Sequence, residues 1–293
     1  MKVSYYPGCT LKTSAKNMND SAIAAMAKLD VELEELPRWN CCGAVYSLAD
    51  DDLLHLVAPV RDLIRVKDLG YDKVVTVCSM CYNTLARANK LMRESAEKRY
   101  TINSFMEEES DYAGEVEVLH LLPFLRDHIG WDKVKEKVVR PLTDIKISPY
   151  YGCTLTRPKE VAIDRADNPR ILHDFLEALG ATVVTNPSGI ECCGSYNILS
   201  NPEAAYHNIN KIITGASGHG AEAIASSCPL CEYSLGKRQK QATEMFGDGR
   251  TLPTFYFTQL LAIALGADES SCHFEIGHQD SRQLLVNKNL INA

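Results

Sequence analysis

The chain has 293 residues, of which 45% are hydrophobic and 24% charged, a balance typical of soluble globular proteins. Its formal net charge of −7 argues against a nucleic-acid-binding surface. The N-terminal sequence MKVSYYPGC lacks an apolar signal core, and the most apolar run, residues 255–267, is too short to span a bilayer. We therefore expect a cytoplasmic protein, in which eleven reduced cysteines indicate metal or redox chemistry rather than disulfides.

Short β-prone runs alternate with helical patterns along the chain, which predicts an α/β fold with parallel sheets. In chain order we expect a strand at 2–6, helices at 14–29 and 47–69, a strand at 73–77, a helix at 79–96, an apolar helix at 119–125, a strand at 144–148, a helix at 169–179, a strand at 181–185, a helix at 202–214, a strand at 221–226, and helices at 229–245 and 258–265.

Three cysteine motifs occur in the same order in both halves. The first half reads YYPGCTLKTS, WNCCGAVYSLA and VCSMCYNTL, and the second reads YYGCTLTRP, IECCGSYNILS and SCPLCEYSL. Matched cysteines are 144, 151 and 150 residues apart, which places a small insertion at residues 157–169. We predict two tandem α/β units related by internal duplication, residues 1–143 and 144–293, each with a short parallel sheet flanked by helices. Cys272 lies outside the repeat, and we interpret it as an ordinary free thiol.

Each half supplies a lone cysteine, a vicinal pair followed by glycine, and a CxxC motif. Loops at the carboxyl ends of parallel strands meet at one edge of a sheet, so we expect each set of five to converge. A CxxC motif at a helix start can bind one metal, whereas adjacent thiols suit two different irons better than one tetrahedral ion. Structural zinc and a cubane cluster both use four ligands, so five thiols favour another iron–sulfur cluster. Structural zinc remains an alternative.

At these motifs the sequence resembles the CCG-domain family, most closely the B subunit of the heterodisulfide reductases of methanogens. The resemblance implies two non-cubane [4Fe–4S] clusters, and cleavage of the coenzyme M–coenzyme B mixed disulfide to two thiols between them. It assigns as metal ligands Cys9, Cys41, Cys42, Cys78 and Cys81 in the first half, and Cys153, Cys192, Cys193, Cys228 and Cys231 in the second.

We expect the catalytic contacts to come from three cysteines of each half, with one histidine of each half as a proton donor to the departing thiolate. The cysteines are Cys9, Cys42, Cys81, Cys153, Cys193 and Cys231, and the histidines are His55 and His207. An anionic substrate needs basic residues, for which the principal candidates are Lys12, Arg157 and Lys211, followed by Lys159, Lys237 and Arg238. Tyr5, Tyr6, Tyr150 and Tyr151 precede the lone cysteines and are expected to shield the clusters from water.

The chain contains neither a ferredoxin-type cysteine run nor a G-x-G-x-x-G motif after a strand, so its electrons must come from elsewhere. The resemblance implies two partners: a ferredoxin-like C subunit with two cubane clusters, and a flavin-containing A subunit that couples to a hydrogenase or formate dehydrogenase. A second hypothesis is an electron-relay protein, similar to CCG proteins of fumarate, glycerol-phosphate and lactate oxidation systems, that binds no disulfide. A third is a zinc scaffold for protein assembly.

Overall fold

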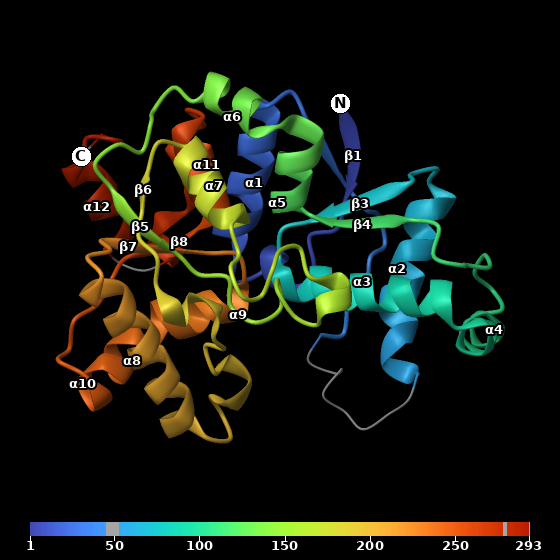
Figure 1. Cartoon of the computed structure of the whole chain (residues 1–293). Helices are drawn as coiled ribbons and strands as arrows, with labels where there is room; N and C mark the ends of the chain where they lie inside the picture. The colour runs from blue at the N-terminus through green and yellow to red at the C-terminus, as the bar shows by residue number, and fades with distance from the viewer. Residues whose placement is uncertain (45–52, 278–279, 293) are drawn as a thin grey trace.

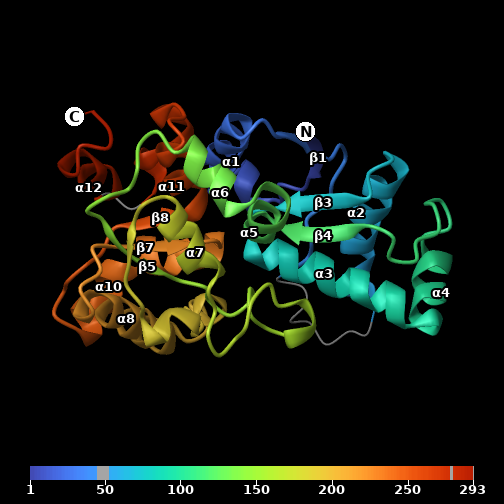
Figure 2. The same cartoon turned by 45° about the horizontal axis from the view of Figure 1, so that its top comes forward.

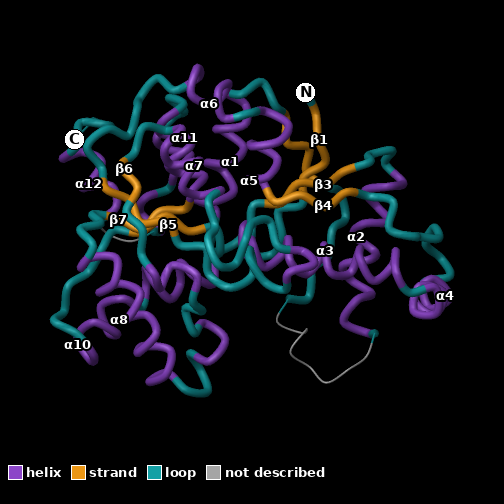
Figure 3. Tube along the Cα trace, in the orientation of Figure 1, coloured by secondary structure: helices purple, strands orange, loops and turns teal. Residues whose placement is uncertain are grey.

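The computed structural model describes residues 1–44, 53–277 and 280–292. These residues form two four-stranded parallel sheets with the same strand order, β2-β1-β3-β4 in the first half and β6-β5-β7-β8 in the second. Helices flank both sheets (Figure 1), and the strands lie in two separate groups with helices and loops between them (Figure 3). The repeated order confirms the predicted α/β class and the internal duplication.

The strands are short, and the inner ones are apolar because neighbouring elements cover both of their faces. The inner strand β7, with the sequence AIAS, is buried at every position. The first sheet contains β1 (Lys2–Tyr5), β2 (Glu32–Glu35), β3 (Lys73–Thr76) and β4 (Glu117–His120); the second contains β5 (Lys146–Pro149), β6 (Thr182–Val183), β7 (Ala223–Ser226) and β8 (Thr254–Tyr256).

The helices follow the strands, as expected for βαβ units. None of the helices in the described ranges combines the length and the apolar character that crossing a bilayer requires. Their bounds are α1 (Lys16–Lys28), α2 (Val57–Asp68), α3 (Ser79–Glu94), α4 (Ala96–Phe105), α5 (Leu121–Phe124), α6 (Trp131–Lys137), α7 (Ile171–Ala178), α8 (Pro202–Gly218), α9 (Pro229–Glu232), α10 (Gln239–Phe246), α11 (Phe257–Ala264) and α12 (Ser281–Asn287).

The five predicted strands are present, but sequence patterns missed β2, β4 and β8. Strand β2 reads ELEE and lies at a sheet edge, where charged side chains stay in water. The helix expected at 119–125 begins at Leu121, because β4 extends to His120. The helix expected at 229–245 is divided by a π turn, η8 (Tyr233–Lys237). Of the helix expected at 47–69, residues 47–52 lie outside the described residues.

The helix that closes each half packs against the first helix of the other half. Helix α11, which follows β8, lies on α1, where the Ser21 and Thr258 hydroxyl oxygens are 2.8 Å apart. Helices α5 and α6 of the first half lie on α7 of the second, and the Trp131 and Phe175 rings are 6.1 Å apart. Figures 1 and 2 show these helices together between the sheets. The larger hydrophobic core, extending from Val3 to Leu285, therefore contains residues of both halves, while a smaller one around α8 and α10 belongs to the second half. The boundary at residues 143 and 144 stays a prediction.

The segment between Cys153 and α7 is longer than its counterpart between Cys9 and α1, as the predicted insertion at 157–169 requires. It contains one short turn, η5 (Lys159–Val161), and it crosses onto α3 of the first half. There the Tyr82 hydroxyl donates to the Val161 carbonyl at 2.9 Å, and the Asn83 amide donates to the Arg157 carbonyl at 2.7 Å. The second half thus covers part of the first.

Candidate metal centre

All ten repeated cysteines follow the carboxyl ends of strands. Cys9 and Cys153 come after the inner strands β1 and β5, and the vicinal pairs come after the edge strands β2 and β6. Cys78 and Cys228 are the N-cap residues of α3 and α9. Parallel strands of one sheet end at a common edge, so each half collects its five thiols there.

Within each half the sulfur atoms are in contact. In the first half, the Sγ atoms of Cys9 and Cys41 are 3.5 Å apart, and those of Cys42 and Cys81 are also 3.5 Å apart. In the second half, the Sγ atoms of Cys193 and Cys231 are 3.7 Å apart. Five further pairs of thiols interact, namely Cys41 with Cys42, Cys78 with Cys81, Cys153 with Cys192, Cys192 with Cys193, and Cys228 with Cys231.

The two sets of cysteines meet at the CxxC motifs. The thiol of Cys78 interacts with the thiol of Cys228, and the Ser79 amide donates to the Ser227 carbonyl at 3.0 Å. The carboxyl ends of β3 and β7 accordingly face each other across the middle of the molecule (Figure 2). The ten thiols form one unbroken series of neighbours that runs from Cys9 to Cys153.

Some of these thiols favour the charged thiolate form more than others. The pKa of Cys42 falls to about 4 because Cys41 and Cys81 interact with its thiolate, and the pKa of Cys192 falls to about 2 because Cys153 and Cys193 do the same. The pKa of Cys81 rises, since its partners Cys42 and Cys78 compete for the proton and burial disfavours its charge. Each half therefore contains a thiol that favours the thiolate form within a group of soft sulfur donors, which suits iron or another thiophilic metal.

Two equivalent tyrosines form hydrogen bonds to the loops that carry the vicinal cysteines. The Tyr6 hydroxyl donates to the Asn40 carbonyl at 2.6 Å, and the Tyr150 hydroxyl donates to the Glu191 carbonyl at 2.7 Å. Burial raises the pKa of both phenols, and nearby thiolates raise it further. The other two predicted tyrosines are also buried, but their hydroxyls pair with Asn19 and His173 instead.

The backbone around the thiols leaves room that a side chain would fill. A Cβ placed on Gly8, whose φ is +79°, would lie 2.9 Å from the Cys81 sulfur. Gly43 and Gly194, which follow the vicinal pairs, also have positive φ, at +74° and +76°. In the described ranges no group of three or more His, Cys, Asp or Glu side chains is arranged to hold a single metal ion. Five soft donors per half and these glycines fit an iron–sulfur cluster.

Gly8→Ala is expected to lower the iron and sulfide content of the purified protein, because the new Cβ displaces the Cys81 sulfur. Gly70→Ala is the matched control: its φ is +80°, and nothing lies within 4 Å of the position of its Cβ. Both variants should lose about 1–2 kcal/mol of unfolding free energy through backbone strain, which thermal melts will measure. Equal iron content in the two variants would show that the space beside Cys81 is not needed.

Four of the six predicted basic residues have hydrogen-bonding or ionic partners in the structure. The Lys12 ammonium lies 2.6 Å from the Glu35 carboxylate, and the Lys211 ammonium lies 2.8 Å from the Glu191 carboxylate. The Arg157 guanidinium donates to the Ile190 carbonyl at 2.9 Å, two residues before Cys192. The Arg238 guanidinium donates to the Tyr233 hydroxyl, while Lys159 and Lys237 are exposed. A role for these residues in substrate binding stays a prediction.

The two predicted histidines have different surroundings. His55 is half-buried in the turn η3 (Leu54–Leu56), and its carbonyl oxygen lies 3.7 Å from the position of a Cβ on Gly43. His207 is exposed on α8, with its ring 5.7 Å from the Phe246 ring. The eleventh cysteine, Cys272, is fully buried away from both sets, and burial raises its pKa to about 12.

A cavity of about 510 Å³ opens beside the first set of thiols, and we call it the cysteine cavity. Its walls include all five cysteines of the first half, together with Met80 and with Pro229 and Leu230 of the second half. Sequence reasoning missed these three apolar residues. Their position between the two cysteines of a CxxC motif could have identified them as residues that lie beside the thiols.

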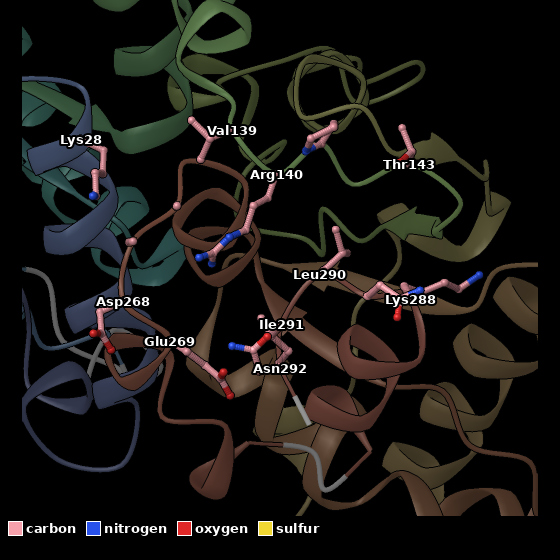
Figure 4. A pocket seen from close by; sticks show the side chains of 14 residues that line it. Lys28, Val139, Arg140, Thr143, Asp268, Glu269, Lys288, Leu290, Ile291 and Asn292 are labelled. Carbon is pink, nitrogen blue, oxygen red and sulfur yellow. The ribbon is translucent and has the colours of Figure 1, made fainter.

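A larger cavity, of about 860 Å³, lies elsewhere (Figure 4). The end of α1, the segment that joins the two halves and the C-terminal residues line it, and no cysteine does. Cationic residues such as Arg140 share its walls with Asp268 and Glu269. It is separate from the candidate metal centre.

The cysteine-rich domain family CCG matches residues 3–86 and 147–236. The chain belongs to this family. Over 292 residues it is 30% identical to the 8-methylmenaquinol:fumarate reductase membrane anchor subunit of Wolinella succinogenes, covering 99% of this chain and 97% of that protein. It is 29% identical over 270 residues to the B subunit of a ferredoxin/F420H2-dependent CoB-CoM heterodisulfide reductase from Methanosarcina acetivorans, covering 90% of this chain and 89% of that protein.

A similar B subunit, of a ferredoxin:CoB-CoM heterodisulfide reductase from Methanosarcina mazei, is 27% identical over 274 residues, covering 90% of this chain and 89% of that protein. Among solved structures, a hypothetical protein from Helicobacter pylori has the same fold, with a TM-score of 0.76 at 12% identity. That match covers 94% of this chain and 51% of the other. Both CCG segments contain a complete set of five cysteines, so the family match coincides with the candidate metal centre.

Proposed function

We propose that this chain is the catalytic subunit of a heterodisulfide reductase, an oxidoreductase that acts on a sulfur group. It reduces the coenzyme M–coenzyme B mixed disulfide to two thiols between two non-cubane [4Fe–4S] clusters. The observation that carries this proposal is the meeting of the two cysteine sets at Cys78 and Cys228, beside a cavity with walls from both halves. The names of two relatives agree with it.

Opening one disulfide bond consumes two electrons and two protons and gives two thiols. An iron–sulfur cluster normally passes one electron at a time, so two clusters would together supply the pair. The chain's own task is to hold the S–S bond between the two cysteine sets and to keep water away from it. Met80, Pro229 and Leu230 provide apolar walls for this purpose.

Protons for the two products must come from nearby acids. We keep His55 as the candidate donor for the first half, since it is half-buried and its carbonyl lies beside Gly43. His207 is the candidate for the second half, although its ring packs against Phe246. Electrons would arrive from the partners of a cytoplasmic complex, a C subunit with two cubane clusters and a flavin-containing A subunit that couples to a hydrogenase or formate dehydrogenase.

The test is anaerobic purification followed by iron and acid-labile sulfide analysis, then addition of coenzyme M–coenzyme B disulfide with a reduced dye. We expect about eight irons and eight sulfides per chain, corresponding to two four-iron clusters. Thiol release should equal two per disulfide consumed. Tightly bound zinc without sulfide would overturn the proposal in favour of the scaffold hypothesis.

A second function is that of an electron-relay protein, which passes electrons and binds no disulfide. The specific observation in its favour is the 30% identity to a fumarate reductase membrane anchor subunit over nearly the whole of both chains. The same adjacent clusters would support transfer from one half to the other. Full clusters that exchange electrons with a menaquinol analogue, but release no thiol from the disulfide, would establish this function instead.

A further inference from the structure

Tyr196 of the second half extends its phenol to the cysteine cavity beside the first set of thiols. Its hydroxyl donates to the Ala44 carbonyl oxygen at 3.3 Å, and the same hydroxyl oxygen lies 3.7 Å from the Met80 sulfur. Ala44 and Met80 both line the cysteine cavity. The Tyr196 hydroxyl therefore lies at the edge of that cavity, although its residue belongs to the other half of the chain.

A tightly packed turn directs Tyr196 towards the first half. Tyr196 lies in the turn η7 (Ser195–Asn197), which begins directly after Gly194. Gly194 has a φ of +76°, and a Cβ at this position would lie only 2.8 Å from the Cα of Ala205 on α8. Because only glycine fits there, the turn lies close against α8 and its direction is held. The matching position of the first motif carries Val45, which has no hydroxyl.

The phenol of Tyr196 lies near thiols of both cysteine sets. Burial raises its pKa, and two thiols of each half raise it further, namely Cys42 and Cys78 of the first half and Cys153 and Cys228 of the second. Tyr256 also interacts with thiols of both sets, but its side chain is fully buried. Tyr196 is only half-buried, so a molecule in the cysteine cavity can reach its hydroxyl.

The two acceptors that the Tyr196 hydroxyl has in the structure are weak ones. Its hydrogen bond to the Ala44 carbonyl is longer than the distance of about 2.7–2.8 Å that is typical of a hydroxyl donor to oxygen. The second acceptor, the thioether sulfur of Met80, accepts only weakly. An ionised acceptor forms a hydrogen bond roughly twice as strong as a neutral one. The hydroxyl can therefore turn to a thiolate that forms in the cavity.

We propose that the Tyr196 hydroxyl donates a hydrogen bond to the substrate sulfur that becomes a thiolate in the cysteine cavity. This inference rests on the proposed function, because the opening of a disulfide supplies that thiolate. Two electrons break the S–S bond and give two thiolates, which then take up two protons. Tyr196 keeps its own proton, since a phenol is less acidic than a thiol. A neutral disulfide sulfur accepts weakly, so the hydrogen bond strengthens as the S–S bond opens and lowers the barrier to that step.

Tyr196→Phe keeps the ring and removes the hydroxyl, so it tests the hydrogen bond directly. Its kcat for disulfide reduction should fall about thirtyfold, as for the loss of one hydrogen bond to a charged group. KM should stay near the wild-type value, because the bond to the uncleaved disulfide is weak. Tyr100→Phe, which removes the hydroxyl of an exposed tyrosine on α4, is the matched control and should keep the wild-type kcat. Rates are expressed per cluster-loaded chain, and melting temperatures check the fold of both variants.

A binding measurement gives a second readout that needs no turnover. The ligands are 1-propanethiol and its isomer ethyl methyl sulfide, of which only the thiol can become a thiolate. Their binding to the cluster-loaded protein is followed by calorimetry and by changes in the visible spectrum. Tyr196→Phe should weaken the binding of propanethiol about tenfold and leave that of ethyl methyl sulfide unchanged.

The outcomes separate this inference from the proposed function. If Tyr196→Phe reduces the disulfide and binds propanethiol like the wild type, the hydrogen-bond proposal is wrong and the reductase function stands. If the wild type reduces no disulfide but its propanethiol binding depends on the Tyr196 hydroxyl, the hydrogen bond stands and the reductase function is wrong. Equal losses in the binding of propanethiol and ethyl methyl sulfide would mean that Tyr196 only shapes the cavity, and would overturn the proposal.

Discussion

Cys81→Ser is expected to remove one cluster and all disulfide reduction. Iron and sulfide should fall from about eight each to about four each per chain. Cys81 is buried at the centre of the first set, where its sulfur lies 3.5 Å from that of Cys42 and interacts with Cys78. A serine hydroxyl is a harder and less acidic ligand, so it cannot replace a thiolate on iron.

The equivalent variant of the second half, Cys231→Ser, should have the same effect on both measurements. Each variant keeps one complete set of five thiols, yet neither should release thiol from the disulfide, because one cluster alone supplies one electron. Cys272→Ser is the control, since Cys272 is a buried thiol that is outside both sets. A single-set variant that retained half the wild-type rate would mean that each half works independently, and that the shared mechanism is wrong.

The repeat in the sequence was sufficient to predict the duplication, because matched motifs in matched order leave few other interpretations. It also predicted the inner strands and most helices, whose apolar periodicity is strong. The edge strand β2 was not predicted, since its ELEE sequence lacks an apolar pattern. Strand β8 was not predicted either, because it runs directly into the apolar helix α11. Local patterns thus determine the elements of each half.

The relation between the halves is a tertiary property that no local pattern reveals. Thr258 is polar in an apolar helix, and only the structure shows that it pairs with Ser21 of the other half. Nothing in the two CxxC motifs indicated that Cys78 and Cys228 meet. The anchoring of the insertion had a weak signal, because Tyr82 and Asn83 immediately follow Cys81 on a helix that otherwise needs apolar residues there.

The two candidate functions place different demands on the same centre. A relay needs clusters close enough for electron transfer, which adjacent cysteine sets already provide. A reductase also needs space for a substrate beside them. The cysteine cavity provides such space next to the first set of thiols, with Pro229 and Leu230 of the second half in its wall, so we favour the reductase even though the fumarate reductase relative is similarly close in sequence.

Asp62→Asn is expected to flatten the dependence of stability on pH. Asp62 is buried on α2, where its carboxylate accepts from the Asn40 amide at 2.7 Å and thereby holds the loop before Cys41. Burial raises the pKa of Asp62 to about 7, although the Asn40 amide and Arg65 oppose the rise. The unfolded chain releases the same proton near pH ~4. Between these values the folded protein binds more protons than the unfolded chain, so its stability falls as pH rises.

The asparagine variant keeps an acceptor for Asn40 and carries no titrating proton. Between about pH 4 and pH 7, its free energy of unfolding should therefore fall by on the order of 1–3 kcal/mol less than that of the wild type. Thermal melts across this range will measure the difference. Asp248→Asn, which changes an exposed carboxylate, should leave the slope at the wild-type value. Burial also raises the pKa of Glu232 to about 7, so adding Glu232→Gln should flatten the curve further. Identical slopes for Asp62→Asn and the wild type would mean that Asp62 is already ionised at low pH, and that Arg61 and Arg65 offset its burial.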